Sequence, residues 1–251
     1  YRTMDLEGAA KKEQITRALY LFCLIFQLPV EVYNPVRNRP FLLYLIIGLN
    51  LAIFIGVVGM NPESVSGFYL TFGAMPEKLL SMIGIFSLIS YAFLHVSWFH
   101  VIFNMYFLWI FGDNVLDVFM DHGFGKGNVL FLVYYLVLSI LAGLTHCLIN
   151  IFGGNHLPLV GASGAVAGII ASYWLLFPKS QLYQTILFIP FKVPVWFYVA
   201  LFLAGNVTMG LSSGTDCRIS WEAHLGGFAA GYFLLQNFLP FKLEKMETSD
   251  N

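Results

Sequence analysis

The sequence predicts an all-α polytopic membrane protein, a bundle of six transmembrane helices with one membrane-dipping loop. The first reason is composition: of 251 residues, 58% are hydrophobic and only 11% are charged, whereas soluble domains carry about 25% charged residues. The second is the mean hydropathy of +0.74. The third is the position of the charges, which lie at the two ends and between apolar runs, as in a chain that crosses a bilayer several times.

Six apolar segments are long enough to cross a bilayer, which takes about 20 mostly apolar residues in a helix. Helices are expected because backbone polar groups at that depth must be satisfied within the segment. The predicted spans are residues 41–60, 98–119, 129–150, 161–177, 190–209 and 222–239. Residues 1–40 are predicted to form a cytoplasmic or interfacial segment, 41–239 the six-helix domain, and 240–251 a cytoplasmic tail.

Two further apolar segments are not predicted to cross. The run 18–28 is short and is followed by Pro29, which favours an interfacial amphipathic helix over a span. The run 76–95 contains Glu77, Lys78 and several serines. It therefore suits a membrane-dipping loop better than a crossing.

The distribution of basic residues gives the orientation of the spans. With the N-terminus cytoplasmic, 11 of the 13 Lys and Arg residues lie on the inner side, and only Lys78 and Arg218 lie on the outer side. The spans 161–177 and 222–239 then run in the same direction. Ser163 and His224 are therefore expected at similar depth near the outer side.

Several classes of function receive no support from the sequence. A net charge of −1 gives no reason to expect nucleic-acid binding, and Cys23, Cys147 and Cys217 lack metal-ligand spacing. A disulfide between Cys147 and Cys217 stays open. There is no H-E-x-x-H motif of a metalloprotease and no G-x-G-D motif of an aspartyl protease. The polar N-terminus and the apolar run after it are not expected to form a signal peptide.

Ser163 and His224 are the candidates for a nucleophile and its base. A serine hydroxyl needs an adjacent base, and neutral imidazole fills that role near pH 7. A lone membrane serine more often has a structural role, but ionisable residues within spans are rare and usually functional. Glycines at an interval of four let two helices approach closely enough for a Ser–His contact. These glycines are Gly164 and Gly168 on one span, and Gly227 and Gly231 on the other.

A third polar group lies at the start of the span 98–119. His100 and Asn104 are four residues apart and share one helix face. Both side chains can donate hydrogen bonds to an oxyanion, and His95 lies at the preceding loop junction. A buried polar network is the competing interpretation, whereas two His and one Asn make a poor zinc site. We expect no metal.

Together these residues resemble the rhomboid family of intramembrane serine proteases. The matching motifs are His95-x4-His100-x3-Asn104, Gly161-Ala162-Ser163-Gly164-Ala165 and Ala223-His224-x2-Gly227-x3-Gly231. The resemblance implies that Ser163 is the nucleophile and His224 the base of a dyad without an acid partner. It also implies that the Ser163 N–H, His100 and Asn104 stabilise the oxyanion, that Gly227 and Gly231 pack against the Ser163 helix, and that residues 61–97 form the family's lateral loop.

The chain departs from the family pattern at three places. The Trp-Arg pair common in the loop is replaced by Phe86 and Ser87. An acidic position is Leu116, flanked by Asp113 and Asp117, and a tyrosine that in some members packs under the catalytic histidine is Ala167.

The expected function is that of an intramembrane serine endopeptidase that cleaves transmembrane segments near the outer face. Substrates would enter from the bilayer between spans 98–119 and 190–209, the latter being either a gate or lipid-facing surface. No cofactor is expected. The compact core suggests a prokaryotic inner or plasma membrane with both termini cytoplasmic. A non-catalytic rhomboid-like binding protein and a transporter are the alternatives, and substrate and oligomeric state stay open.

Overall fold

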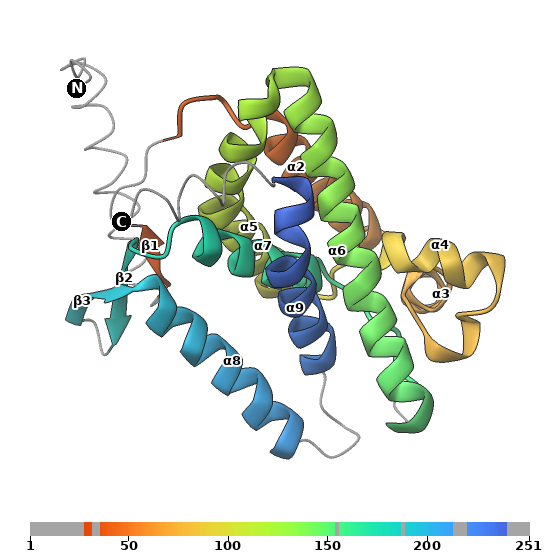
Figure 1. The fold of residues 1–251 in the computed structure, drawn as a ribbon. Coiled ribbons are helices and arrows are strands. Elements are labelled where there is room, and N and C mark those ends of the chain that lie inside the picture. The colour runs from red at the N-terminus through yellow and green to blue at the C-terminus, as the bar shows by residue number, and fades with distance from the viewer. Residues whose placement is uncertain (1–27, 32–35, 154–155, 187–188, 213–219, 240–251) are drawn as a thin grey trace.

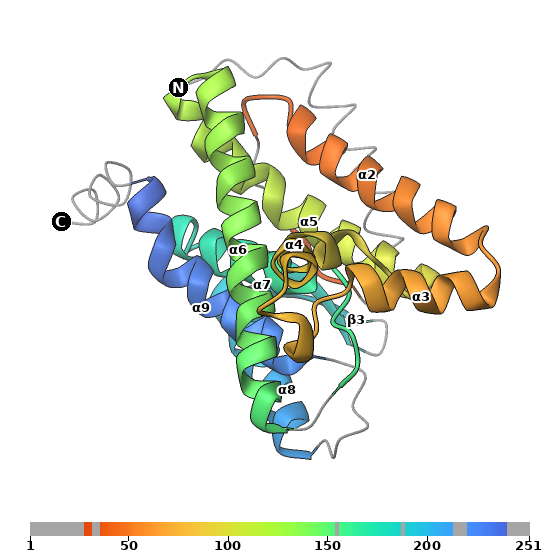
Figure 2. The same ribbon diagram turned by 90° about the vertical axis from the view of Figure 1, so that its right-hand side faces the viewer.

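A computed structural model describes residues 28–31, 36–153, 156–186, 189–212 and 220–239 of the chain. Helices α5, α6, α7 and α9 gather in the centre, and α8 and the α3–α4 segment lie on opposite flanks (Figures 1 and 2). The longer helices are α2 (Phe41–Val58), α3 (Pro62–Phe72), α4 (Met82–Ser90), α5 (Trp98–Phe119), α6 (Phe124–Gly153), α7 (Ser163–Leu176), α8 (Val195–Ser212) and α9 (Trp221–Phe238). The short elements are β1 (Val30–Glu31), η1 (Pro76–Lys78), η2 (Tyr91–Phe93), η3 (Met120–His122), β2 (Gln181–Ile186) and β3 (Ile189–Pro194).

Helices α7 and α9 pack backbone against backbone through glycines. A methyl group added to Gly227 would overlap the carbonyl oxygen of Gly164, and one added to Gly231 would overlap the carbonyl of Gly168. Both pairs advance by four residues in the same direction, so the two helices run parallel. Close approach of this kind replaces the hydrophobic driving force that helices lack inside a bilayer.

Three helices within the described residues are long and apolar enough to cross a membrane: Phe41–Val58, Trp98–His122 and Phe124–Phe152. Helix α7 and the apolar part of α8 are shorter than the usual span. The predicted spans thus correspond to helices at similar positions, while the count of six crossings stays a prediction.

The prediction of a purely α-helical protein was incomplete. Strands β1, β2 and β3 form an antiparallel sheet in that order, with Tyr183 opposite both Val30 and Lys192. The predicted span 190–209 was also wrong at its start, because residues up to Pro194 belong to β3 and α8 begins at Val195. The β2–β3 hairpin follows the C-terminal end of α7, so it lies at the opposite end of that helix from Ser163.

The predicted loop 61–97 contains two short helices connected to the segment before Ser163. The Tyr69 hydroxyl of α3 donates to the His95 carbonyl at 2.6 Å. Ala74 and Leu159 exchange backbone hydrogen bonds of 3.1 and 2.8 Å. These contacts hold the loop against the Ser163 end of the bundle, while its depth in a bilayer stays a prediction.

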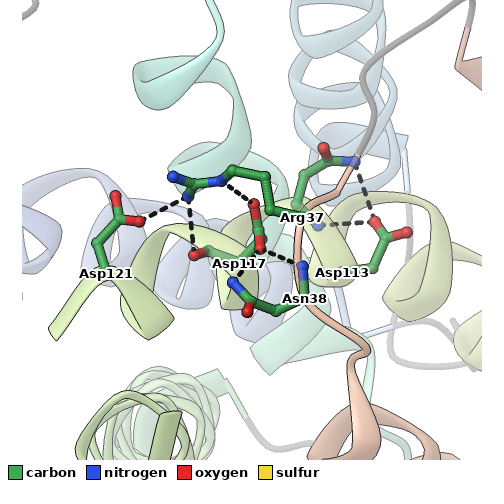
Figure 3. Close-up of polar contacts among 6 residues, drawn as sticks. Arg37, Asn38, Asp113, Asp117 and Asp121 are labelled. Atoms are coloured by element: carbon green, nitrogen blue, oxygen red, sulfur yellow. Dashed lines mark hydrogen bonds and ion pairs between the residues drawn. The ribbon is translucent and has the colours of Figure 1, made fainter. Parts of the chain in front are cut away.

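An ion-pair cluster fixes the chain before α2 to the other end of α5 (Figure 3). Arg37 Nε lies 2.9 Å from Asp117 Oδ2, and Arg37 Nη2 lies 2.7 Å from Asp121 Oδ1. Asp117 Oδ1 accepts from the backbone and side-chain nitrogens of Asn38, each at 2.9 Å. Asp113 instead accepts from Asn114. Of the two carboxylates that flank Leu116 in the sequence, Asp117 therefore makes this connection.

The α7–α9 contact predicts a large effect of one methyl group. Gly231→Ala should lower stability by about 1–3 kcal/mol or more, because the methyl overlaps the backbone of Gly168 and forces the helices apart. Thermal unfolding of the purified protein in detergent measures this loss. Gly48→Ala in α2 is the control, since its methyl meets no atom within 4 Å, and it should change stability by no more than about 1 kcal/mol. Equal unfolding temperatures for the two variants would contradict the prediction.

Candidate active site

Ser163 is the first residue of α7, at a sharp turn of the backbone. Gly161 has a φ of +119°, a conformation that side chains other than glycine rarely adopt. Its N–H donates to the Tyr91 carbonyl at 2.9 Å, and the Tyr91 hydroxyl donates to the Ser139 carbonyl at 2.7 Å. The turn is therefore held from η2 and α6. It places Ser163 where the helix N–H groups have no intrahelical partner and the helix dipole is positive.

The structure places the side chain of His224 against that of Ser163. His224 Nε2 lies 2.8 Å from Ser163 Oγ, and both side chains are partly buried. The contact spans 61 positions of sequence and depends on the parallel packing of α7 and α9. Its length is that of an ordinary hydrogen bond, so the imidazole is positioned to take the hydroxyl proton.

Sequence reasoning missed a third member of this group, Asn206 of α8. Asn206 Oδ1 lies 2.7 Å from His224 Nδ1, and Asn206 is only 6% exposed. The expected dyad without an acid partner therefore has an amide as its additional neighbour. A signal was present in the sequence, because Asn206 is a polar residue inside an apolar run, but nothing there connected it to His224.

His100 and Asn104 lie on the other side of the same turn. A Cβ built on Gly161 would lie 2.6 Å from His100 Nε2 and 3.5 Å from Asn104 Nδ2. Asn104 is 6% exposed, and its Nδ2 has no hydrogen-bond partner among the described residues. Two side-chain nitrogens thus converge on the backbone just before Ser163. A donor placed there could bind a negatively charged oxygen.

His95 packs against the ring of His100 rather than against the turn at Gly161. The two rings are 4.9 Å apart in an edge-to-face arrangement. His95 is 1% exposed, and within the described part of the chain neither of its ring nitrogens has a hydrogen-bond partner. Burial lowers the pKa of His95 to about 3, with a smaller contribution from His100. A neutral His95 can pack against His100 without repelling it.

A second polar cluster connects α9 to α6 near the dyad. Glu222 Oε1 lies 2.8 Å from His146 Nδ1 and 2.6 Å from Asn150 Nδ2. All three residues are at least 90% buried. Burying a polar group is costly unless it is hydrogen-bonded, and these three side chains bond to each other. The cluster therefore anchors the start of α9, two residues before His224.

Residues 84–240 match the family model described as Rhomboid domain. The chain belongs to the rhomboid family. The resemblance inferred from the sequence motifs is thereby confirmed. The matched range contains both segments of the proposed dyad as well as His100, Asn104 and Asn206.

Rhomboid relatives in three organisms match the chain over 150 to 204 residues. Presenilin-associated rhomboid-like protein, mitochondrial, of Mus musculus is 27% identical, with 57% of this chain and 35% of that protein covered. RHOMBOID-like protein 12, mitochondrial, of Arabidopsis thaliana is 30% identical, covering 57% and 43%. Rhomboid protein 1, mitochondrial, of Saccharomyces cerevisiae is 29% identical, covering 76% and 51%. The chain spans about a third to a half of the length of these rhomboid proteins.

The expectation of a prokaryotic inner or plasma membrane, with cytoplasmic termini, was wrong. The relatives in mouse, plant and yeast are all named as mitochondrial proteins. A compact membrane core could not identify the compartment, because mitochondrial rhomboid proteins contain a matching segment of similar length. The possible partner of Cys147, Cys217, lies outside the described residues, as do residues 18–27, 1–17 and 240–251.

The buried Glu222 cluster predicts a loss of stability on its removal. Glu222→Ala leaves the His146 Nδ1 donor buried without its acceptor and removes one bond of Asn150 Nδ2, which keeps the His146 carbonyl at 2.9 Å, so the cost should be about 1–3 kcal/mol. Denaturation in mixed micelles measures the change, with Glu63→Ala on the exposed surface of α3 as the control. A Glu222→Ala protein as stable as the control would show that the cluster does not anchor α9.

Proposed function

We propose that this rhomboid protein is an intramembrane serine endopeptidase of a mitochondrial membrane. Its substrates would be transmembrane segments of other membrane proteins. The observation that supports this most directly is the 2.8 Å contact between His224 Nε2 and Ser163 Oγ. Membership of the rhomboid family and the mitochondrial relatives support the compartment and the class of reaction.

In the proposed reaction, Ser163 Oγ attacks the carbonyl carbon of a peptide bond while His224 Nε2 takes its proton. The protonated imidazole then gives the proton to the leaving amine, and an acyl ester remains on Ser163. Water hydrolyses that ester, with His224 again taking a proton and Ser163 recovering its hydroxyl. General-base assistance of this kind contributes about 10²–10⁴-fold to rate.

The negative charge of the tetrahedral intermediate needs donors that are already in place. Asn104 Nδ2 is a buried donor without a partner among the described residues, and His100 Nε2 lies beside Gly161. With the Ser163 N–H at the start of α7, these groups form the proposed oxyanion hole. A donor that is not already bonded can stabilise the developing charge without first losing another interaction.

The proposed substrate route lies between α5 and α8. Within the bundle these helices meet at Tyr198, whose ring centroid lies 6.3 Å from that of Phe107 and 5.8 Å from that of Phe111. Asn206 lies further along α8 from this contact, next to His224 of α9. A substrate helix must unwind locally at the site, because its carbonyl groups are otherwise occupied by backbone hydrogen bonds. The proposal also includes six membrane crossings, with residues 41–239 forming the protease domain.

The nucleophile can be tested with a serine-reactive fluorophosphonate probe on the purified full chain. Wild-type protein should be labelled, and Ser163→Ala and His224→Ala should each lose labelling, because one lacks the oxygen and the other its base. Ser172→Ala is the control, since Ser172 lies further along α7 and bonds to Tyr134 and the Gly168 carbonyl. An unlabelled wild type would favour a non-catalytic binding protein or a transporter, and equal labelling of Ser163→Ala would remove the nucleophile assignment.

The oxyanion hole predicts a loss of turnover without unfolding. His100→Ala and Asn104→Ala should each slow cleavage of a transmembrane peptide by about 10- to 1000-fold, because each removes one donor. The circular dichroism of each variant should stay that of the wild type. Asn128→Ala on α6, whose amide bonds only its own helix among the described contacts, should keep the wild-type rate. A normal rate for Asn104→Ala would exclude Asn104 from the hole.

A further inference from the structure

We propose that Asn206 is a positioning residue that fixes the tautomer and the orientation of the His224 ring. The proposal rests on the serine protease function proposed above, and it assigns to α8 a part in the chemistry. It follows from the two hydrogen bonds of the Asn206 amide, one to the Phe202 carbonyl of its own helix and one to Nδ1 of the His224 ring.

The orientation of the Asn206 amide is set by its own helix. Asn206 Nδ2 lies 2.8 Å from the carbonyl oxygen of Phe202, four residues earlier. A carbonyl oxygen can only accept a hydrogen bond, so the NH₂ group must face Phe202. The amide oxygen is then the atom that faces His224, and it too can only accept.

This acceptor decides which ring nitrogen carries the proton. Because Asn206 Oδ1 lies 2.7 Å from His224 Nδ1, a neutral ring places its proton on Nδ1. Nε2 then has a free lone pair toward Ser163 Oγ, 2.8 Å away. A serine hydroxyl can donate to that lone pair, which is the arrangement that general-base catalysis requires. In the opposite tautomer, Nε2–H would face the hydroxyl and could not take its proton.

Helix α8 also supplies a ring wall for His224. The Phe202 ring centroid is 6.1 Å from that of His224, and Phe202 lies one helical turn from Asn206. One face of α8 therefore contacts the imidazole with both an apolar ring and a hydrogen-bond acceptor. The position at which some family members have a supporting tyrosine is Ala167 here, so support for the ring comes from α8.

Other titratable groups near His224 do not compete for this role. Glu222 and His100 interact with His224 electrostatically, but the Glu222 carboxylate is hydrogen-bonded to His146 and Asn150. Among the described hydrogen bonds, Asn206 provides the contact to Nδ1. An acceptor on α8 makes the state of the base depend on the position of that helix against α9.

The experiment measures the fluorophosphonate labelling rate of the full chain against pH for Asn206→Ala, Asn206→Asp and Asn50→Ala. Asn50 is the matched control, because it is also a buried helical asparagine whose Nδ2 donates to the carbonyl four residues earlier, at 2.8 Å from Ile46. Its Oδ1 has no partner among the described residues. The two asparagines therefore differ in the contact under test.

Asn206→Ala should slow labelling by about 10- to 100-fold, a part of the general-base contribution, while Asn50→Ala keeps the wild-type rate. Asn206→Asp should recover the rate near neutral pH, because a carboxylate also accepts from Nδ1. It should also move the acidic limb of the profile to higher pH, because it stabilises the protonated ring. A purely structural role would not move that limb. A wild-type rate and profile for Asn206→Ala, or no recovery in Asn206→Asp, would overturn the proposal.

A second measurement separates this proposal from the proposed function. Nitrogen-15 NMR of histidine-labelled protein in a Ser163→Ala background reports the tautomer of His224 without any need for activity. With Asn206 present, the proton should be on Nδ1; with Asn206→Ala, the Nε2–H form should appear. An unchanged tautomer would refute the role of Asn206 even in an active enzyme. Absence of labelling in wild type would count against the protease function alone.

Discussion

The contact between the backbones of α7 and α9 is the constraint on which the site depends. Gly227 and Gly231 allow α9 to lie against the carbonyls of Gly164 and Gly168, and a serine side chain is too short to reach a histidine across a wider gap. Helix α6 strengthens the contact, since the Tyr134 hydroxyl donates to the Gly231 carbonyl at 3.0 Å. Each dispersion contact is weak, but a close backbone interface contains many of them, so together they hold α7 against α9.

The dyad is held differently on its two sides. Ser163 is fixed by backbone geometry, through the turn at Gly161 and its bond to Tyr91. His224 reaches Ser163 from α9, but its ring is oriented by side chains of α8. Helix α8 lies on the flank of the bundle (Figure 1), beside the proposed substrate route. If both proposals hold, the helix that orients the base is therefore also one of the two helices that border the substrate route.

Sequence reasoning succeeded where a local pattern has few physical explanations. Paired glycines four residues apart predict close packing, and the α7–α9 contact and the Ser163–His224 hydrogen bond are both present, while the function expected of His224 stays a prediction. Asn206 was missed because an asparagine that bonds the carbonyl four residues earlier is ordinary, and Asn50 and Asn128 do the same. The sheet was missed because Val30 and Glu31 form a strand only through pairing with a hairpin about 150 residues away. The compartment was predicted wrongly because the apolar segments of a membrane core do not indicate which membrane contains it.

Burial without a hydrogen-bond partner does not by itself mark a polar atom as functional. What distinguishes such an atom here is that it converges with other polar atoms on one point of the structure. Among the described residues, Asn50 Oδ1 and the Tyr135 hydroxyl are also buried without partners, each at a cost of about 1–3 kcal/mol, yet neither adjoins a nucleophile. Asn104 Nδ2 adjoins the turn that positions Ser163, where His100 Nε2 also lies. Glu222 Oε1 is bonded to both His146 and Asn150, whereas Asn104 Nδ2 has no partner among the described residues and lies where, in the proposed reaction, a substrate oxygen would become negative. We therefore assign an anchoring role to the Glu222 group and the proposed oxyanion role to Asn104.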